Sequence, residues 1–201
     1  MSKKLFNYWN ALRAGRPAPE RSEIEPSDIR DILGDTFILE VSQRMRTISF
    51  RLAGTRLCAA YGRELKGLGF LALWQEDDNF EIAQAVMHVY RNQVPVMLSY
   101  TGATEAQRFV EFEAILLPLM PAADGNARIL GVAAPRKTPY WLGAEPIVSN
   151  HLRTARPIEI RRETADETPS LMPADGLPIG EEDIASQRRV AHLTVIEGGR
   201  D

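Results

Sequence analysis

Few side chains in this sequence stand at a spacing that could do chemistry. Glu111 and Glu113 lie two residues apart on one face of a predicted strand, which would suit an acid pair for proton transfer. The solvated face of an antiparallel sheet carries the same pattern, and we favour that interpretation. His151 and His192 are isolated in the sequence, with no second ligand at metal spacing. The sequence therefore predicts neither a catalytic residue nor a metal site.

Composition and charge narrow the classes of function further. The 201 residues carry a formal net charge of −3, which offers no basic field for a phosphate backbone, so we expect no nucleic-acid partner. The single cysteine, Cys58, cannot form an internal disulfide, which fits a reducing compartment. The sequence shows no signal peptide and no run of the roughly 18 apolar residues needed to span a bilayer. We therefore expect a cytoplasmic protein without membrane contact.

The amino-terminal segment predicts an amphipathic helix over residues 3–14. Its apolar stripe consists of Leu5, Tyr8, Trp9 and Leu12. This stripe must be buried against another apolar surface, and two arrangements are possible: the helix could pack across a homodimer, or it could fold back on its own sheet. A proline-containing connector and a second short helix complete residues 1–33, which we assign to an amino-terminal region.

Alternating apolar and polar residues predict five strands. They cover residues 36–42, 45–52, 94–101, 108–119 and 128–134. A helix predicted over residues 78–91 separates the second strand from the third. Short polar joints favour antiparallel neighbours. This order predicts an α+β fold in which a five-stranded antiparallel sheet lies beside a helical layer.

The stretch over residues 50–67 carries the most specific pattern. It reads as the end of a strand, a turn at Gly54, a short helix, and closing glycines at Gly62 and Gly67. Together with the helices that interrupt the sheet after its second strand, this stretch resembles the PAS domain over about residues 34–136. Tyr8-Trp9, Leu12-Arg13, Gly15-Arg16 and the Pro19-x-Arg21 step are similar to a family of small bacterial stand-alone PAS proteins of mostly unknown function.

The resemblance implies a non-enzymatic sensory or regulatory module that acts through a small ligand, through protein contacts, or through both. It further implies a homodimer and a signalling protein partner that the sequence does not identify. A small apolar ligand would lie between the inner sheet face and the long helix. The candidate pocket residues on alternate strand positions are Phe50, Leu98, Tyr100, Phe112 and Val132. Ordinary core packing explains the same residues, and we favour it over ligand contact.

Two residues invite a cofactor interpretation within the PAS family. Light-sensing members add a cysteine to a flavin, but Cys58 lacks the asparagine-containing motif around that cysteine. Haem-binding members carry their iron ligand on the long helix, where His88 lies. His88 shares its side of the predicted helix with Glu81 and Gln84, so we expect a solvated histidine rather than a haem ligand. The cofactor, if there is one, stays unspecified.

One alternative fold class remains open from the sequence. A cone-shaped α+β protein of the isomerase-like type, an enzyme or a ligand-binding protein, also wraps a curved sheet around an apolar cavity. That fold places most helices before most strands, whereas here a hairpin comes first. We assign residues 34–145 to the PAS-like domain and residues 146–201 to a largely mobile extension. A β-like island at residues 192–196 could add to a sheet edge.

Overall fold

The computed structural model describes residues 1–42, 44–121 and 126–160. Three α-helices and six strands form its regular elements, joined by short 3₁₀ turns. In chain order these are α1 (Ser2–Arg13), β1 (Thr36–Ser42), β2 (Thr47–Ala53), α2 (Thr55–Ala60), α3 (Asn79–Asn92), β3 (Val96–Thr104), β4 (Phe109–Pro118), β5 (Ala127–Pro135) and β6 (Ile147–Pro157). None of these helices is long and apolar enough to cross a membrane.

The strands form one antiparallel sheet in the order β2-β1-β5-β4-β3-β6. The sequence-based expectation of five strands is therefore wrong, because β6 adds a sixth strand beside β3. This strand begins within residues 146–201, the segment that the sequence assigned to an extension. Its mixture of charged and apolar residues suits an edge strand whose side chains stay partly exposed, so the apolar alternation is weak. The island at residues 192–196 lies outside the described residues.

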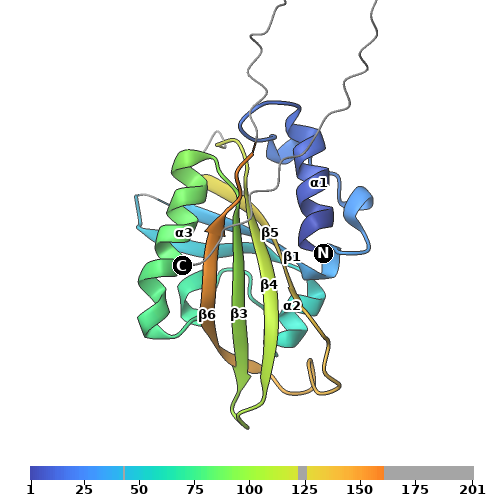
Figure 1. Cartoon of the computed structure of the whole chain (residues 1–201), viewed down its shortest axis with the longest axis vertical. Helices are drawn as coiled ribbons and strands as arrows, with labels where there is room; N and C mark the ends of the chain where they lie inside the picture. The colour runs from blue at the N-terminus through green and yellow to red at the C-terminus, as the bar shows by residue number, and fades with distance from the viewer. Residues whose placement is uncertain (43, 122–125, 161–201) are drawn as a thin grey trace, which may run out of the picture. The chain divides into compact units, whose positions relative to one another are not determined.

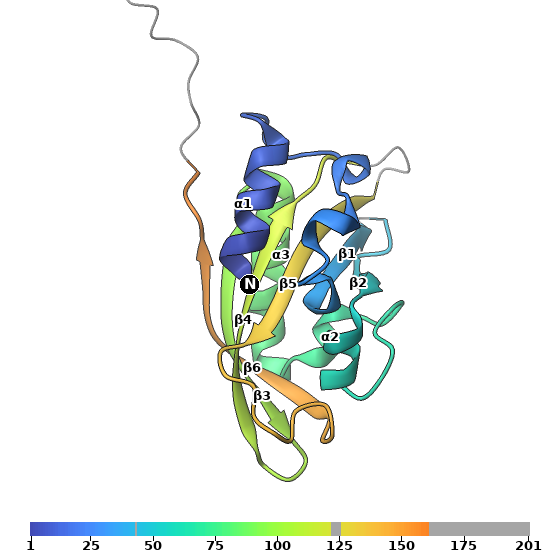
Figure 2. The same ribbon diagram turned by 90° about the vertical axis from the view of Figure 1, so that its right-hand side faces the viewer.

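The two faces of the sheet carry separate apolar clusters. Helix α3 contacts β3, β4, β5 and β6 on one face, and α1 contacts β4 and β5 on the other (Figures 1 and 2). The inner cluster, under α3, includes Phe37, Leu39, Val41, Leu98, Tyr100, Phe112, Ala114 and Leu116. The outer cluster, under α1, includes Leu5, Trp9, Ile38, Ile115, Leu117, Leu130 and Val132. Strands β4 and β5 are therefore covered on both faces, as the period-2 alternation of their side chains requires.

Helix α1 folds back on the sheet of its own chain. Leu5 and Trp9 are fully buried in the outer cluster, and the indole Nε1 of Trp9 donates to the carbonyl oxygen of Pro118 at 2.7 Å. Tyr8 and Leu12 pack at the rim of the same cluster, where the Tyr8 hydroxyl accepts a hydrogen bond from the backbone of Glu25 at 2.8 Å. Of the two arrangements that the sequence allows for α1, the structure shows the one in which the helix folds back on its own sheet.

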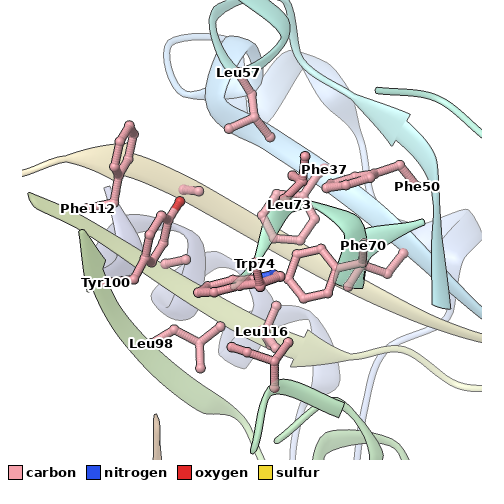
Figure 3. Packing of buried hydrophobic residues seen from close by; sticks show 14 of the residues in the cluster. Phe37, Phe50, Leu57, Phe70, Leu73, Trp74, Leu98, Tyr100, Phe112 and Leu116 are labelled. Carbon is pink, nitrogen blue, oxygen red and sulfur yellow. The ribbon is translucent and has the colours of Figure 1, made fainter. Parts of the chain in front are cut away.

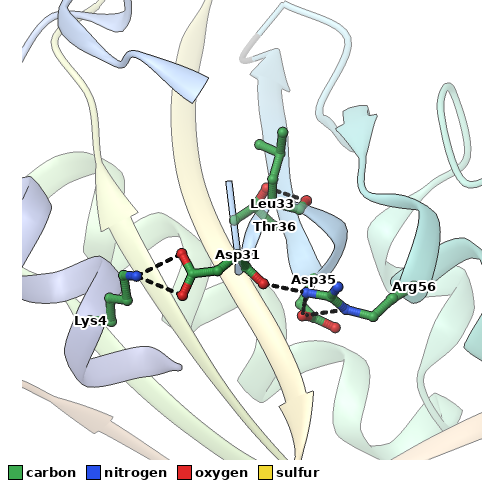
Figure 4. Close-up of polar contacts among 6 residues, drawn as sticks. All are labelled: Lys4, Asp31, Leu33, Asp35, Thr36 and Arg56. Carbon is green, nitrogen blue, oxygen red and sulfur yellow. Dashed lines mark hydrogen bonds and ion pairs between the residues drawn. The ribbon is translucent and has the colours of Figure 1, made fainter. Parts of the chain in front are cut away.

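Charged side chains of α1 and α2 bind the segment that leads from α1 to β1 (Figure 4). Lys4 of α1 lies 2.6 Å from the carboxylate of Asp31, and Arg56 of α2 donates to the backbone oxygen of Asp31 at 2.8 Å. The same guanidinium binds the carboxylate of Asp35, whose side chain is nearly buried. This hydrogen bond to Asp35 raises the pKa of Arg56. The end of this segment is thus held by α1 on one side and by α2 on the other, which helps to position α1 over the sheet.

Gly54 is required for a close approach of two backbone segments. We expected it to allow a turn, but its φ of −72° and ψ of 157° are open to any residue. A Cβ at this position would lie 2.3 Å from the carbonyl oxygen of Gly34 and 2.4 Å from that of Leu33. Gly62 and Gly67 match the expectation, since their φ angles of 61° and 82° fall in the left-handed region.

Candidate functional site

Aromatic rings fill the space between the inner sheet face and the α2–α3 segment (Figure 3). A continuous series of ring contacts, with centroids 4.9 to 5.7 Å apart, runs through Phe50, Phe70, Trp74, Tyr100 and Phe112. The space left among these rings, the core cavity, measures about 20 Å³. A water molecule needs roughly 10–15 Å³, so the core cavity has room for one molecule of that size and not for a larger ligand.

Polar groups lie inside this aromatic core. The amide of Asn150 on β6 lies 2.9 and 3.2 Å from the hydroxyl of Tyr61. Burial raises the pKa of Tyr61 and raises that of Tyr100 further. Both hydroxyls therefore stay protonated near neutral pH and act as hydrogen-bonding groups. The indole Nε1 of Trp74 is buried beside them without a hydrogen-bond partner in the described part of the chain.

A larger cavity lies between the β1–β2 hairpin and α3, and we call it the hairpin cavity. Its volume is about 310 Å³, and it opens to solvent. Apolar side chains form most of its lining: Val41, Ile48, Leu71, Ala83 and Met87. Ser42 and Thr47 add hydroxyl groups, and the guanidinium groups of Arg46 and Arg91 add positive charge. Pockets that hold small ligands start at roughly 300 Å³, so this cavity suits a small one.

The predicted pocket residues do not all meet. Phe50, Leu98, Tyr100 and Phe112 belong to the inner cluster, and Phe50 and Tyr100 border the core cavity. Val132 lies in the outer cluster, on the opposite face, which corrects its predicted inward position.

The physical reason is Gly131, the neighbour of Val132 on β5. Gly131 faces inward, where a Cβ would lie 2.3 Å from the ring of Phe37. Because successive side chains alternate across a sheet, Val132 must face outward.

The sequence-based prediction missed the residues around the hairpin cavity. None of the five predicted pocket residues lines this cavity. Its lining comes from β1, β2, α3 and the turn around Leu71, which lie far apart in the sequence. A partial signal existed, because Ala83 and Met87 are apolar residues four positions apart beside the main stripe of α3.

The residues with possible cofactor chemistry lie away from both cavities. His88 Nδ1 is 2.9 Å from the amide nitrogen of Asn92, and its side chain borders a groove between α3 and β6. Cys58 Sγ lies 3.6 Å from a carboxylate oxygen of Glu64, and burial raises the pKa of the thiol. Within residues 1–42, 44–121 and 126–160, no group of acidic, histidine and cysteine side chains could hold a metal ion.

Comparison with known proteins places this architecture in a family. A family model described as a PAS domain matches residues 1–134. The chain belongs to the PAS domain family. PAS domains are generally sensory and without enzymatic activity, and they commonly mediate protein interactions. The match includes α1 and nearly all of β5 but ends before β6, so the sixth strand of this PAS domain lies beyond the matched residues. A comparison with curated proteins finds no match.

Proposed function

We propose that this PAS domain is a non-enzymatic regulatory module that senses a small apolar ligand in the hairpin cavity and signals through α1. One observation carries the proposal: α3 and α1 pack on opposite faces of the same two strands, β4 and β5. A ligand against Ala83 and Met87 contacts α3 directly. Any displacement of α3 reaches α1 through only one layer of backbone.

The packing on the two faces supports this route. Phe112, Ala114 and Leu116 point from β4 into the inner cluster, while Ile115 and Leu117 point from the same strand into the outer cluster. Close-packed interiors transmit small shifts because they hold few voids. A ligand that favours one position of α3 would therefore shift the population of α1 between docked and released states.

The buried polar groups favour a binding role over a catalytic one. Burial raises the pKa of Tyr61 and of Tyr100 above the ordinary value, which makes either hydroxyl a still poorer general base near neutral pH. Asp35 is buried, and its carboxylate pairs with Arg56 rather than with a tyrosine. The isomerase-like alternative, which would need a buried aspartate beside a tyrosine, gains no support from this arrangement.

The proposal includes a homodimer, a signalling protein partner and a cytoplasmic location. Helix α1 covers β4 and β5, and the outer face at the other end of β4 carries Phe109, whose side chain is 59% exposed. We assign the contact with another protein chain to this end of the outer face, which α1 leaves uncovered. The partner would recognise either this face or the released α1.

Native mass spectrometry of the full chain, purified from its own organism, tests the proposal. We expect a dimer mass that includes a small molecule retained in each chain. A bare monomer mass in the purified protein and in fresh lysate would contradict both the ligand and the dimer. A bare dimer would contradict the ligand and favour a PAS domain that serves protein contacts alone.

A further inference from the structure

The hairpin cavity combines an apolar floor with a positively charged rim. Val41 is 3% exposed, and Ile48, Leu71 and Met87 pack against the inner cluster while still lining the cavity. These side chains present hydrocarbon to any molecule that enters. A ligand without an apolar body would therefore leave this floor in contact with water, so the floor selects a ligand with a hydrocarbon part.

The rim carries two guanidinium groups that have no partner among the described residues. Arg46 lies in the β1–β2 turn, and Arg91 lies in the last turn of α3. Across the described residues, neither forms a hydrogen bond or an ion pair, and no acidic side chain lines the cavity. The carboxylate of Glu40, which precedes Val41 on β1 and does not line the cavity, binds Arg51 at 3.0 Å and lies 3.8 Å from Arg128. In the described part of the chain, the two positive charges therefore face a cavity whose lining offers them no counter-ion.

We infer that the hairpin cavity takes a medium-chain carboxylate, whose hydrocarbon chain lies on the apolar floor and whose carboxylate binds Arg46 and Arg91. A guanidinium matches a carboxylate with two parallel hydrogen bonds, and such charge-assisted bonds are stronger than neutral ones. The hydroxyls of Ser42 and Thr47 can donate to the same group. This inference rests on the proposed function, since it assigns a chemical class to the ligand of the same cavity.

The size of the cavity limits the length of the chain. A volume of about 310 Å³ stands at the lower end of the roughly 300–1,000 Å³ range of ligand pockets. Octanoate is therefore a suitable probe, and octanamide is its neutral counterpart of nearly the same shape. Both are titrated into the full chain below their aggregation range, with binding followed by calorimetry.

Substitutions separate the charge from the apolar floor. We expect octanoate to bind about tenfold more tightly than octanamide, and Arg46→Gln or Arg91→Gln to weaken octanoate about tenfold while leaving octanamide unchanged. Arg30→Gln is the matched control, because Arg30 is exposed and lies outside the cavity. Ala83→Leu narrows the cavity from α3 and should weaken the binding of both probes.

Each result bears on a distinct part of the account. Equal affinity for octanoate and octanamide would overturn the carboxylate assignment and leave a small apolar ligand in place. An octanoate affinity that is unchanged in Ala83→Leu would overturn the location. Failure of both probes to bind, beside a retained molecule of another class in the native mass spectrum, would overturn this inference while the proposed function stands.

Discussion

Replacing Trp9 with alanine tests how strongly α1 is held by its own sheet. Trp9 is fully buried in the outer cluster, and Nε1 donates to the backbone oxygen of Pro118 at 2.7 Å. The guanidinium of Arg13 also lies over its ring, 5.5 Å from the centroid. Trp9→Ala removes all three interactions while keeping a residue that favours the helix.

The expected cost follows from the burial. Truncation of a fully buried tryptophan to alanine lowers the free energy of unfolding by about 3–5 kcal/mol, because apolar contact area is lost and a cavity is left behind. Trp9→Phe keeps most of the apolar contact but leaves the oxygen of Pro118 without its donor, which costs about 1–3 kcal/mol. A domain of this size is stable by only about 5–15 kcal/mol, so the alanine variant should lose a large part of its stability.

Urea unfolding and amide hydrogen exchange measure the effect together. If α1 releases before the sheet unfolds, the urea midpoint falls less than this estimate and exchange at residues 3–14 rises most. Phe80→Ala is the control, because Phe80 is 74% exposed and should change stability by no more than about 0.5 kcal/mol.

Two results would refute the reasoning. An unchanged midpoint with unchanged exchange at residues 3–14 would mean that Trp9 does not hold α1 on the sheet. A loss of stability that grows as the protein is diluted would mean that α1 packs across a dimer instead.

Other positions allow narrower predictions. Gly131→Ala should lower the free energy of unfolding by about 1–3 kcal/mol in urea, since the added methyl group would meet the buried ring of Phe37. Gly54→Ala should lower it more, because its methyl group would meet backbone atoms. An unchanged free energy of unfolding at either position would contradict the packing. Asn150→Ala should cost about 1–3 kcal/mol by leaving the hydroxyl of Tyr61 unpaired, and the loss should shrink in a Tyr61→Phe background; additive losses would exclude the pair. Cys58, whose pKa is raised, should react with iodoacetamide at pH 8 more slowly than free cysteine, and an equal rate would contradict its burial.

Much of the fold followed from hydrophobic periodicity. The predicted helix over residues 78–91 matches α3 (Asn79–Asn92), and the first five strands lie within a few residues of their observed bounds. Strand β6 was not predicted, because an edge strand needs no continuous apolar alternation. Within β6, the buried position of Asn150 depends on its contact with Tyr61, which lies far away in the sequence.

The candidate site was less predictable than the fold, because its residues come from elements that lie far apart in the sequence. The inward positions of Phe50 and Tyr100 follow from strand alternation, but Val132 was misplaced because its glycine neighbour occupies the inward position under a ring of β1. The hairpin cavity joins elements that meet only in the folded chain. Arg46 and Arg91 look like ordinary surface residues in the sequence, and only their shared cavity distinguishes them.

Hydrogen exchange of residues 3–14, with and without saturating octanoate, tests the central claim most directly. If occupancy of the hairpin cavity changes how α1 packs on the sheet, octanoate must alter exchange in this segment as well as in α3. At the same octanoate concentration the change must be smaller in the Ala83→Leu variant, whose cavity is narrowed. Protection that changes in α3 and the β1–β2 hairpin while residues 3–14 stay the same would contradict the account, because the ligand would then bind without reaching α1.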